Sequence, residues 1–183
     1  VTTAFTINGD AATADTIDIS NFTVAAVGYT GDLAAATGVA FATTNDSIII
    51  NGNSGLDTIT LNASTDDTVK TENAHSVQTS YDVVTGFLSA TDSLDFDGGA
   101  AAAAGQAEGY VENGTDVADF AAALAAADIA LDGTDDYYFA TDGTNGWIFY
   151  DADGAASSTT ALDAVVMLMG VDETGIAQAD LIA

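Results

Sequence analysis

Hydrophobic and polar residues alternate over short stretches in the first half of the chain. These stretches are rich in β-branched residues and are bounded by Gly, Asn or Asp, a pattern typical of short β-strands that end in tight turns. We therefore predict strands at residues 4–7, 16–22, 47–50 and 58–61.

Two of these segments resemble each other. Residues 7–19 align with residues 50–61 once a gap of one residue is allowed, and both contain a turn followed by Asp-Thr-Ile, at Asp15 and at Asp57. The recurrence of one turn-and-strand unit indicates repetition. The absence of proline agrees with stacked strands, because a proline would break their hydrogen-bond ladder.

The pattern changes after an Ala-rich segment at residues 99–107, which we predict to join a β-rich region, residues 1–98, to a second region, residues 108–183. Just beyond the joint, apolar residues recur at intervals of three and four. We predict an amphipathic helix over residues 115–131, which would begin at Thr115 or Asp116. Its apolar face is expected to pack on the core and comprises Val117, Phe120, Leu124 and Ala127.

Three further strands are predicted at residues 137–140, 147–150 and 164–169, with turns between them. They would form a β-meander packed on the helix. The first two of these strands are rich in aromatic residues, and alternation would place about half of them on the buried face. The others either pack in the sheet or form an exposed strip for protein or glycan contact, for example with a cell-surface polysaccharide.

Charge narrows the possible functions. The chain has 24 Asp and four Glu against one Lys and no Arg, for a net charge of −27. Nucleic acids and anionic membranes need basic patches, so we exclude them as partners. The excess of Asp over Glu favours calcium, because short carboxylates suit tight turns that bind cations. Adaptation of an ordinary binding domain to high salt explains the acidity but not the Asp excess.

Catalytic chemistry has few candidate residues. The chain has no Cys, one His (His75) and no Arg, which argues against thiol chemistry, a multi-histidine zinc site and phosphoryl transfer. We therefore predict that the protein is not an enzyme. No apolar stretch approaches the ~20 residues of a membrane-spanning helix. The start at Val1 without Met leads us to expect a processed product or a fragment.

Residues 52–60 match the calcium-binding nonapeptide G-G-x-G-x-D-x-U-x except at the second position, where Asn replaces Gly. The glycines allow the backbone to turn, the Asp supplies a carboxylate, and the apolar residue packs in the core. The alternative is that these polar residues only form turns. The candidate calcium ligands in this segment and just upstream of it are Asp46, Asn51, Asn53, Gly55 and Asp57.

Residues 81–87, Tyr-Asp-Val-Val-Thr-Gly-Phe, and residues 92–97, Asp-Ser-Leu-Asp-Phe-Asp, together resemble the passage that follows the repeats in repeats-in-toxin (RTX) proteins. The resemblance implies that this segment closes a parallel β-roll. It also implies that carboxylates of this segment take part in calcium binding, here Asp92 and Asp95.

Residues 135–139, 146–154 and 165–171 resemble the end of type I-secreted RTX and bacterial surface-layer proteins, with a tyrosine-rich hairpin, Tyr-Asp-x-Asp-Gly and a final apolar strand. Asp151 and Asp153 are the candidate calcium ligands in this segment. The last five residues, 179–183, resemble the uncleaved C-terminal export signal of these proteins.

These observations predict a mainly β protein: an RTX-like parallel β-roll or β-sandwich in the N-terminal part, then one amphipathic helix packed on a β-meander. The predicted function is that of a secreted, non-enzymatic, Ca²⁺-responsive structural protein of a bacterial surface layer, filament or biofilm matrix. It would associate through β-strands into a homo-oligomer or polymer. The alternative is the C-terminal calcium-binding and secretion-targeting domain of a larger exported enzyme or adhesin.

Overall fold

The computed structural model describes residues 5–8, 16–18, 47–51, 55–61, 66–72, 76–97, 109–131, 135–151 and 162–182. Within them the fold is mainly β with one α-helix, as predicted. The elements in chain order are β1 (Phe5–Asn8), β2 (Thr16–Asp18), β3 (Ser47–Asn51), β4 (Thr58–Thr60), β5 (Asp66–Glu72), β6 (Asp82–Thr85), β7 (Ser93–Asp97), β8 (Tyr110–Glu112), α1 (Phe120–Ala130), β9 (Tyr137–Thr141), β10 (Gly146–Tyr150), β11 (Ala164–Met169), η2 (Gln178–Asp180) and β12 (Leu181–Ile182).

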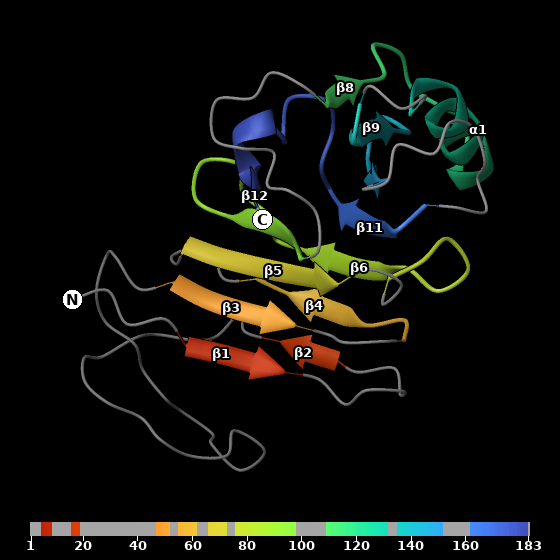
Figure 1. The fold of residues 1–183 in the computed structure, drawn as a ribbon. Coiled ribbons are helices and arrows are strands. Elements are labelled where there is room, and N and C mark those ends of the chain that lie inside the picture. Colours follow the sequence, from red (N-terminus) through yellow and green to blue (C-terminus); the bar gives the residue numbers. More distant parts are fainter. Residues whose placement is uncertain are drawn as a thin grey trace.

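The strands form two sheets, and the chain alternates between them from β1 to β7. One sheet has the order β1-β3-β5-β7-β12, and the other has the order β2-β4-β6-β11-β10-β9-β8. Each strand from β1 to β5 therefore pairs in parallel with the strand two further along the chain. We call strands β1 to β7 the stack, and two consecutive strands, one in each sheet, a rung. Figure 1 shows the rungs rising from β1 and β2 to β5 and β6.

The described residues from 109 to 182, which we call the cap, extend both sheets beyond the last rung. β11 adds to β6 in parallel, and β12 adds to β7 in parallel. β10 and β9 then continue the larger sheet as the predicted antiparallel meander, and β8 pairs in parallel with β9. The two predicted regions therefore share both sheets. The predicted joint at residues 99–107 lies outside the described residues.

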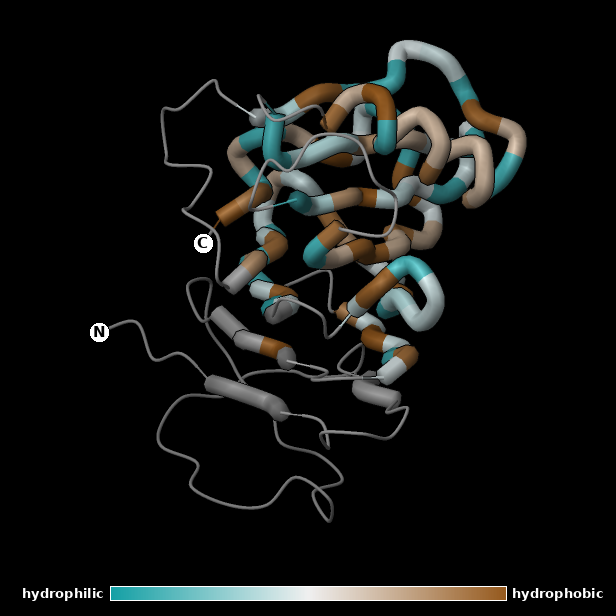
Figure 2. The backbone as a smooth tube through the Cα atoms, turned by 45° about the vertical axis from the view of Figure 1, so that its right-hand side comes forward, coloured by the Kyte–Doolittle hydropathy of each residue, from teal (hydrophilic) through white to brown (hydrophobic). Residues whose placement is uncertain are grey.

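The main hydrophobic core lies between the two sheets. In the smaller sheet, Ile50, Val69, Leu94 and Leu181 occupy successive positions of one register and are at most 1 % exposed. In the larger sheet, a matching row of buried residues consists of Ile59, Val84 and Leu168. Figure 2 shows hydrophobic and polar segments in close succession along the coloured tube from β4 to β7, as expected when alternate residues face the core.

A second core lies between α1 and the outer face of the cap strands. Ala123 and Ala127 of the helix are fully buried against side chains that include Tyr138, Trp147 and Phe149. Because the main core covers the other face of these strands, β9 and β10 are buried along their whole length. The aromatic residues of both strands pack in the core, in agreement with the first of the two predicted alternatives.

The helix begins later than predicted. Asp119, rather than Thr115 or Asp116, is the N-cap, and its side chain accepts a hydrogen bond from the Ala122 N–H. The predicted start was wrong because the preceding residues continue along β9: the Asn113 N–H donates to the Phe139 carbonyl and the Val117 N–H to the Thr141 carbonyl, each at 2.8 Å. These backbone bonds hold residues 113–117 beside β9 rather than in a helical turn.

Candidate functional site

In four strands of the stack, an aspartate at the first strand residue or next to it faces the space between the sheets. Asp57 and Asp82 lie at the starts of β4 and β6 in the larger sheet, and Asp67 and Asp92 lie at the starts of β5 and β7 in the smaller sheet. Their side chains are at most 2 % exposed. In each case the residue two positions later, such as Ile59 after Asp57, is a buried aliphatic residue. Carboxylates therefore occupy positions that alternation would normally give to apolar side chains.

The two sheets place these aspartates at opposite ends of their strands. Figure 1 shows that β3 and β5 point in the direction opposite to β4 and β6, so the strand starts of the two sheets lie on opposite sides of the stack. The four aspartates form two separate pairs, Asp57 with Asp82 and Asp67 with Asp92. Each pair joins adjacent rungs.

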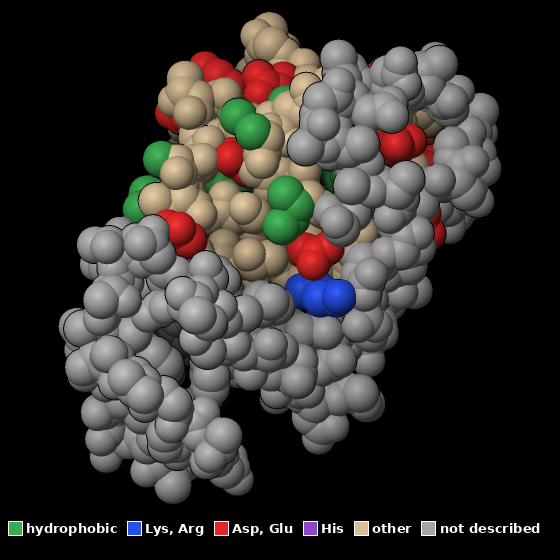
Figure 3. All heavy atoms as spheres, turned by 60° about the vertical axis from the view of Figure 1, so that its left-hand side comes forward, with side chains coloured by type: hydrophobic (Ala, Val, Ile, Leu, Met, Phe, Trp, Pro, Cys, Tyr) green, Lys and Arg blue, Asp and Glu red, His purple; other side chains and the backbone are tan. Residues whose placement is uncertain are grey.

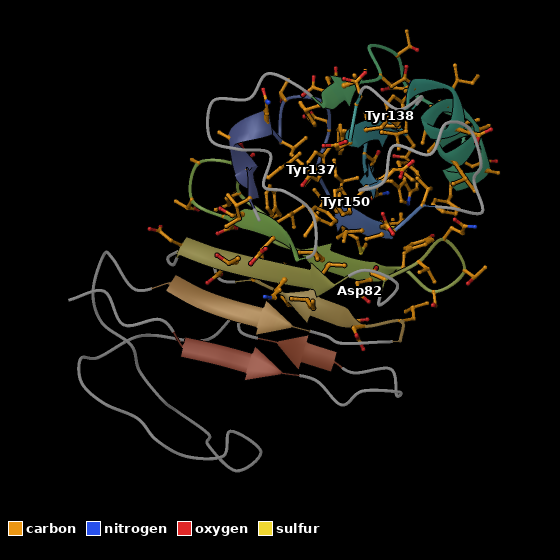
Figure 4. The ribbon with its side chains drawn as sticks, in the orientation of Figure 1. Asp82, Tyr137, Tyr138 and Tyr150 are labelled. Carbon is orange, nitrogen blue, oxygen red and sulfur yellow. The ribbon has the colours of Figure 1, made fainter. Side chains whose placement is uncertain are left out.

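The Asp57/Asp82 pair is connected by hydrogen bonds to the cap. The backbone N–H of Asp57 donates to Oδ1 of Asp82 at 3.1 Å, and the backbone N–H of Asp82 donates to Oγ of Ser76 at 2.6 Å. The buried Ser76 hydroxyl in turn donates to the carbonyl of Val165, whose N–H donates to the Ser76 carbonyl at 2.7 Å. Figure 4 shows Asp82 at the start of β6, just below the cap.

The Asp67/Asp92 pair repeats the first contact. The backbone N–H of Asp67 donates to Oδ1 of Asp92 at 3.1 Å. The other carboxylate oxygen of Asp92 accepts the Leu88 N–H at 2.8 Å, and Thr91 Oγ1 lies 3.3 Å from Oδ1. Asp92 therefore also holds the turn that leads from β6 into β7.

Burial makes both pairs costly to ionise. Burial is the largest cause of the raised pKa of Asp82, about 7, and the neighbouring Asp57 charge adds to the increase. Burial likewise raises the pKa of Asp92 to about 6, with a further contribution from the Asp67 charge. The backbone hydrogen bonds that each carboxylate accepts oppose these increases. A proton or a bound cation would stabilise either pair, because it removes like-charge repulsion in a buried site.

The one basic side chain of the protein lies on the other face of the sheet. Lys70 directly follows Val69 in β5, and successive side chains of a strand point to opposite faces. Lys70 therefore points away from the core that Asp67 and Val69 face. It is in register with Asp95 of β7. Figure 3 shows the lysine beside an acidic side chain on the molecular surface. Lys70 and the inward-facing pairs therefore lie on opposite faces of the sheet.

The structure disperses the sequence-predicted calcium ligands. Asp57 and Asp92 lie in different pairs, and Asp95 faces outward beside Lys70. Gly55 has a φ of 150° in the turn before β4, as expected for its glycine position. Asn51 ends β3, and its side chain is not described. Three predicted ligands lie outside the described residues: Asp46, Asn53 and Asp153.

Asp151 lies in the cap, after β10, and is buried. Burial and the neighbouring Tyr137 are the main causes that raise the pKa of Tyr150, and the charges of Asp163, Asp136 and Asp151 add to the increase. The rings of Tyr137 and Tyr150 stack at a centroid distance of 4.8 Å. Figure 4 shows both tyrosines on the side of the cap nearer the stack, where their rings contact Phe96 of β7, whereas Tyr138 lies toward the helix. Asp151 therefore belongs to a different environment from the stack pairs.

Sequence reasoning missed Asp67 and Asp82, the partners in both pairs. The signal was a period of 25 residues, which separates Asp57 from Asp82 and Asp67 from Asp92. Each repeat contains two copies of Asp-x-aliphatic, one for each sheet. A repeat search at this spacing would have found both pairs.

The site as described is a set of carboxylate pairs. Within the part of the chain that the structure describes, no group of three or more His, Cys, Asp or Glu side chains could hold a metal ion. No helix among these residues has the length and apolarity needed to cross a membrane. Comparison of the sequence with protein-family models and with curated proteins found no match. The fold and the site thus define a mainly β protein that contains paired, buried aspartates.

Proposed function

We propose that the protein is a non-enzymatic, calcium-responsive structural module of a bacterial surface layer, filament or biofilm matrix. The observation that carries the proposal is the repeated placement of buried aspartates at the starts of stacked parallel strands. Alternation of the chain between two parallel sheets agrees with an RTX-like β-roll, in which calcium binds at the turns between strands. Secretion and a cell-surface location follow from the same resemblance.

The carboxylate pairs supply the type of oxygen ligand that calcium prefers, but fewer oxygens than a complete calcium site needs. Calcium prefers hard oxygen ligands, and carboxylates on adjacent rungs supply them. Asp57 and Asp82 would hold the ion on one side of the stack, and Asp67 on the other, where the oxygens of Asp92 already accept N–H groups. Calcium needs six to eight oxygens, so backbone carbonyls of the turns would complete each site. A bound ion would offset the cost of burying two like charges.

Calcium binding is tested by titration of matched neighbours. Asp66 and Asp67 are adjacent, but Asp66 is exposed and Asp67 is fully buried. We expect Asp67→Asn to weaken calcium binding, measured by calorimetry, by about tenfold, and Asp66→Asn to leave it unchanged. Sites with dissociation constants of about 0.1 to 1 mM would each add roughly 0.4 to 1.4 kcal/mol of stability at ~1 mM calcium. Equal effects of the two variants would show that calcium affinity depends only on the net charge of the protein and not on the buried pair.

The structural role is tested by assembly. We expect light scattering and electron microscopy to show ordered assemblies that form with calcium and dissolve in excess chelator. Calcium would lower the repulsion between copies that each carry a charge of −27. A chain that binds calcium but stays monomeric would instead support the second candidate, a targeting domain of a larger exported protein. The burial of Leu181 in the main core, which makes the C-terminal strand part of the fold, is compatible with either role.

A further inference from the structure

We infer that Asn113 is a site of spontaneous modification, at which the folded protein converts the side-chain amide to aspartate and iso-aspartate. The inference does not depend on the proposed function. It rests on a comparison of two Asn-Gly pairs that the structure describes in the cap, Asn113-Gly114 and Asn145-Gly146. The structure leaves the first pair free to react and fixes the second.

The reaction takes place between the two residues of an Asn-Gly pair. The main-chain nitrogen of the glycine loses its proton to base and attacks the side-chain carbonyl carbon of the asparagine, and the side-chain nitrogen leaves as ammonia. Water then opens the cyclic imide at either carbonyl, which gives aspartate or iso-aspartate. Glycine favours the attack because it has no Cβ and leaves the backbone free to turn. Contacts that hold the two reacting groups apart slow the reaction.

At Asn113 both reacting groups are free to approach each other. Among the described residues, no hydrogen bond holds the Asn113 side chain or the Gly114 N–H, and only the backbone N–H of Asn113 is bonded, to the Phe139 carbonyl at 2.8 Å. Gly114 is exposed, and nothing lies within 4 Å of the position that a Cβ would occupy there. Figure 1 shows the chain between β8 and α1 as a loop on the side of the cap away from the stack. Water and base therefore reach this pair.

At Asn145 the same two groups are fixed. Oδ1 of Asn145 accepts the Gly170 N–H at 3.2 Å, and the backbone N–H of Asn145 donates to Oδ1 of Asp142 at 2.8 Å. Gly146 begins β10 and pairs with β9 on one side and β11 on the other. The ring of Phe139 fills the space where a Cβ of Gly146 would lie. The Gly146 nitrogen therefore cannot move toward the Asn145 side chain unless these contacts break.

The two pairs lie in neighbouring segments, which makes each a control for the other. The Val117 N–H donates to the Thr141 carbonyl at 2.8 Å, and a Cβ on Gly143 would lie 2.8 Å from Oδ2 of Asp116. The segment that follows Asn113 thus lies against the turn that contains Asn145. Because both pairs share these acidic surroundings, a difference in their rates reports the local contacts.

Conversion at Asn113 would loosen the segment that leads into α1. Iso-aspartate routes the main chain through the side-chain carbon, which adds a backbone atom between two anchors on β9. These anchors are the bonds from the Asn113 N–H to the Phe139 carbonyl and from the Val117 N–H to the Thr141 carbonyl. The new carboxylate also adds a negative charge to a chain whose net charge is already −27.

Peptide mapping by mass spectrometry tests the inference. Chymotrypsin, which cuts after aromatic residues, would isolate the two pairs in residues 111–120 and 140–147. After incubation of the folded protein in mildly alkaline buffer, we expect Asn113 to be converted about tenfold faster than Asn145. In concentrated urea, where neither pair keeps its contacts, the two rates should be similar.

Two variants sharpen the test. Gly114→Ala should slow conversion of Asn113 by about tenfold, because the added Cβ crowds the attacking nitrogen. Asp142→Ala, which removes the acceptor of the Asn145 N–H, should speed conversion of Asn145 and leave that of Asn113 unchanged. Equal rates at the two asparagines in the folded protein would overturn the inference, because the structure would then not select Asn113. An Asn113 that remains an amide in the folded protein would overturn it as well, whatever its rate in urea.

Discussion

In β4 to β7 of the stack, the row of inward-facing residues begins with a buried aspartate, and the next inward-facing residue is aliphatic, as in Asp82 followed by Val84. In the cap, β9 and β10 are buried on both faces, largely by aromatic side chains. The two regions share sheets and reach the same depth of burial, yet one buries charge and the other buries rings. Hydrophobic burial acts at any pH, whereas a buried carboxylate pair depends on protons or cations.

The difference suggests a division of roles. The cap supplies stability that solution conditions change little, through ring contacts such as Tyr137 with Tyr150 at 4.8 Å and Phe120 with Phe149 at 6.0 Å. The stack supplies the conditional part of the stability. Ser76 links Asp82 of the stack to Val165 of β11 in the cap. The region whose stability depends on pH and cations therefore lies directly beside the region whose stability does not.

The largest effect that we expect to separate the two regions is the pH dependence of the stability that the stack contributes. The pKa of Asp82 is about 7 in the folded protein and about 4 in an unfolded chain. The folded state therefore binds the proton more tightly, and its contribution to stability is fully present below pH ~4 and is lost as the pH rises through ~7. A difference of about three pKa units corresponds to a change in the free energy of unfolding on the order of 4 kcal/mol between these pH limits.

Urea unfolding in chelator at several pH values between about 4 and 8 measures this loss. We expect Asp82→Asn, which keeps an acceptor for the Asp57 N–H but carries no charge, to flatten much of the slope. Asp66→Asn, an exposed neighbour of the other pair, controls for the change in net charge. A slope that both variants reduce equally would show that overall charge, rather than the buried pair, sets the pH dependence.

A smaller effect, confined to the cap, is expected from Gly146→Ala. A Cβ atom at Gly146 would lie 2.2 Å from two ring carbons of Phe139, which is 1 % exposed and has no room to move. We expect a loss of about 3 kcal/mol, the upper part of the usual range for overpacking. Because the cause is steric, the loss should be the same at acid and neutral pH and with or without calcium.

Gly114→Ala is the control for Gly146→Ala, since nothing lies within 4 Å of a Cβ at Gly114. Its stability should stay within about 0.5 kcal/mol of the natural protein. Chemical unfolding of both variants at two pH values measures the comparison. If the loss of stability caused by Gly146→Ala varied strongly with pH, the stability of the cap would depend on solution conditions, contrary to the proposed division of roles.

Much of the fold was predictable from local patterns. The segments at residues 47–50, 58–61, 137–140, 147–150 and 164–169 are strands with bounds close to those predicted, because alternation and turn residues are local signals. Pairing was less accessible. β11 lies beside β6 although about 80 residues separate them, and no spacing in the sequence specifies such a neighbour. The helix start was missed for a similar reason, because β9 holds residues 113–117 through backbone bonds.

The candidate site was predicted by type of residue more than by partner. The nonapeptide drew attention to Asp57, and the RTX-like segment drew attention to Asp92, and both are buried at strand starts. Asp67 lies outside those motifs, and Asp82 lies within the RTX-like segment at residues 81–87 but was not predicted as a ligand. Their role as partners becomes evident only when rungs are stacked. Asp95 was predicted as a ligand from its motif, yet it faces outward beside Lys70. The motif alone does not tell on which face of the strand the side chain lies.

The smallest effect that we predict belongs to the helix of the cap. Oδ1 of Asp119 accepts the Ala122 N–H at 2.9 Å and caps α1. Asp119→Ala should cost about 1 kcal/mol, because the loss of an N-cap leaves a helix N–H without its partner. Asp119→Ser should recover most of that stability, since serine is an equally good N-cap. Urea unfolding of both variants at one pH measures the difference, and an equal loss in the two would mean that the charge of Asp119, rather than its capping hydrogen bond, stabilises the cap.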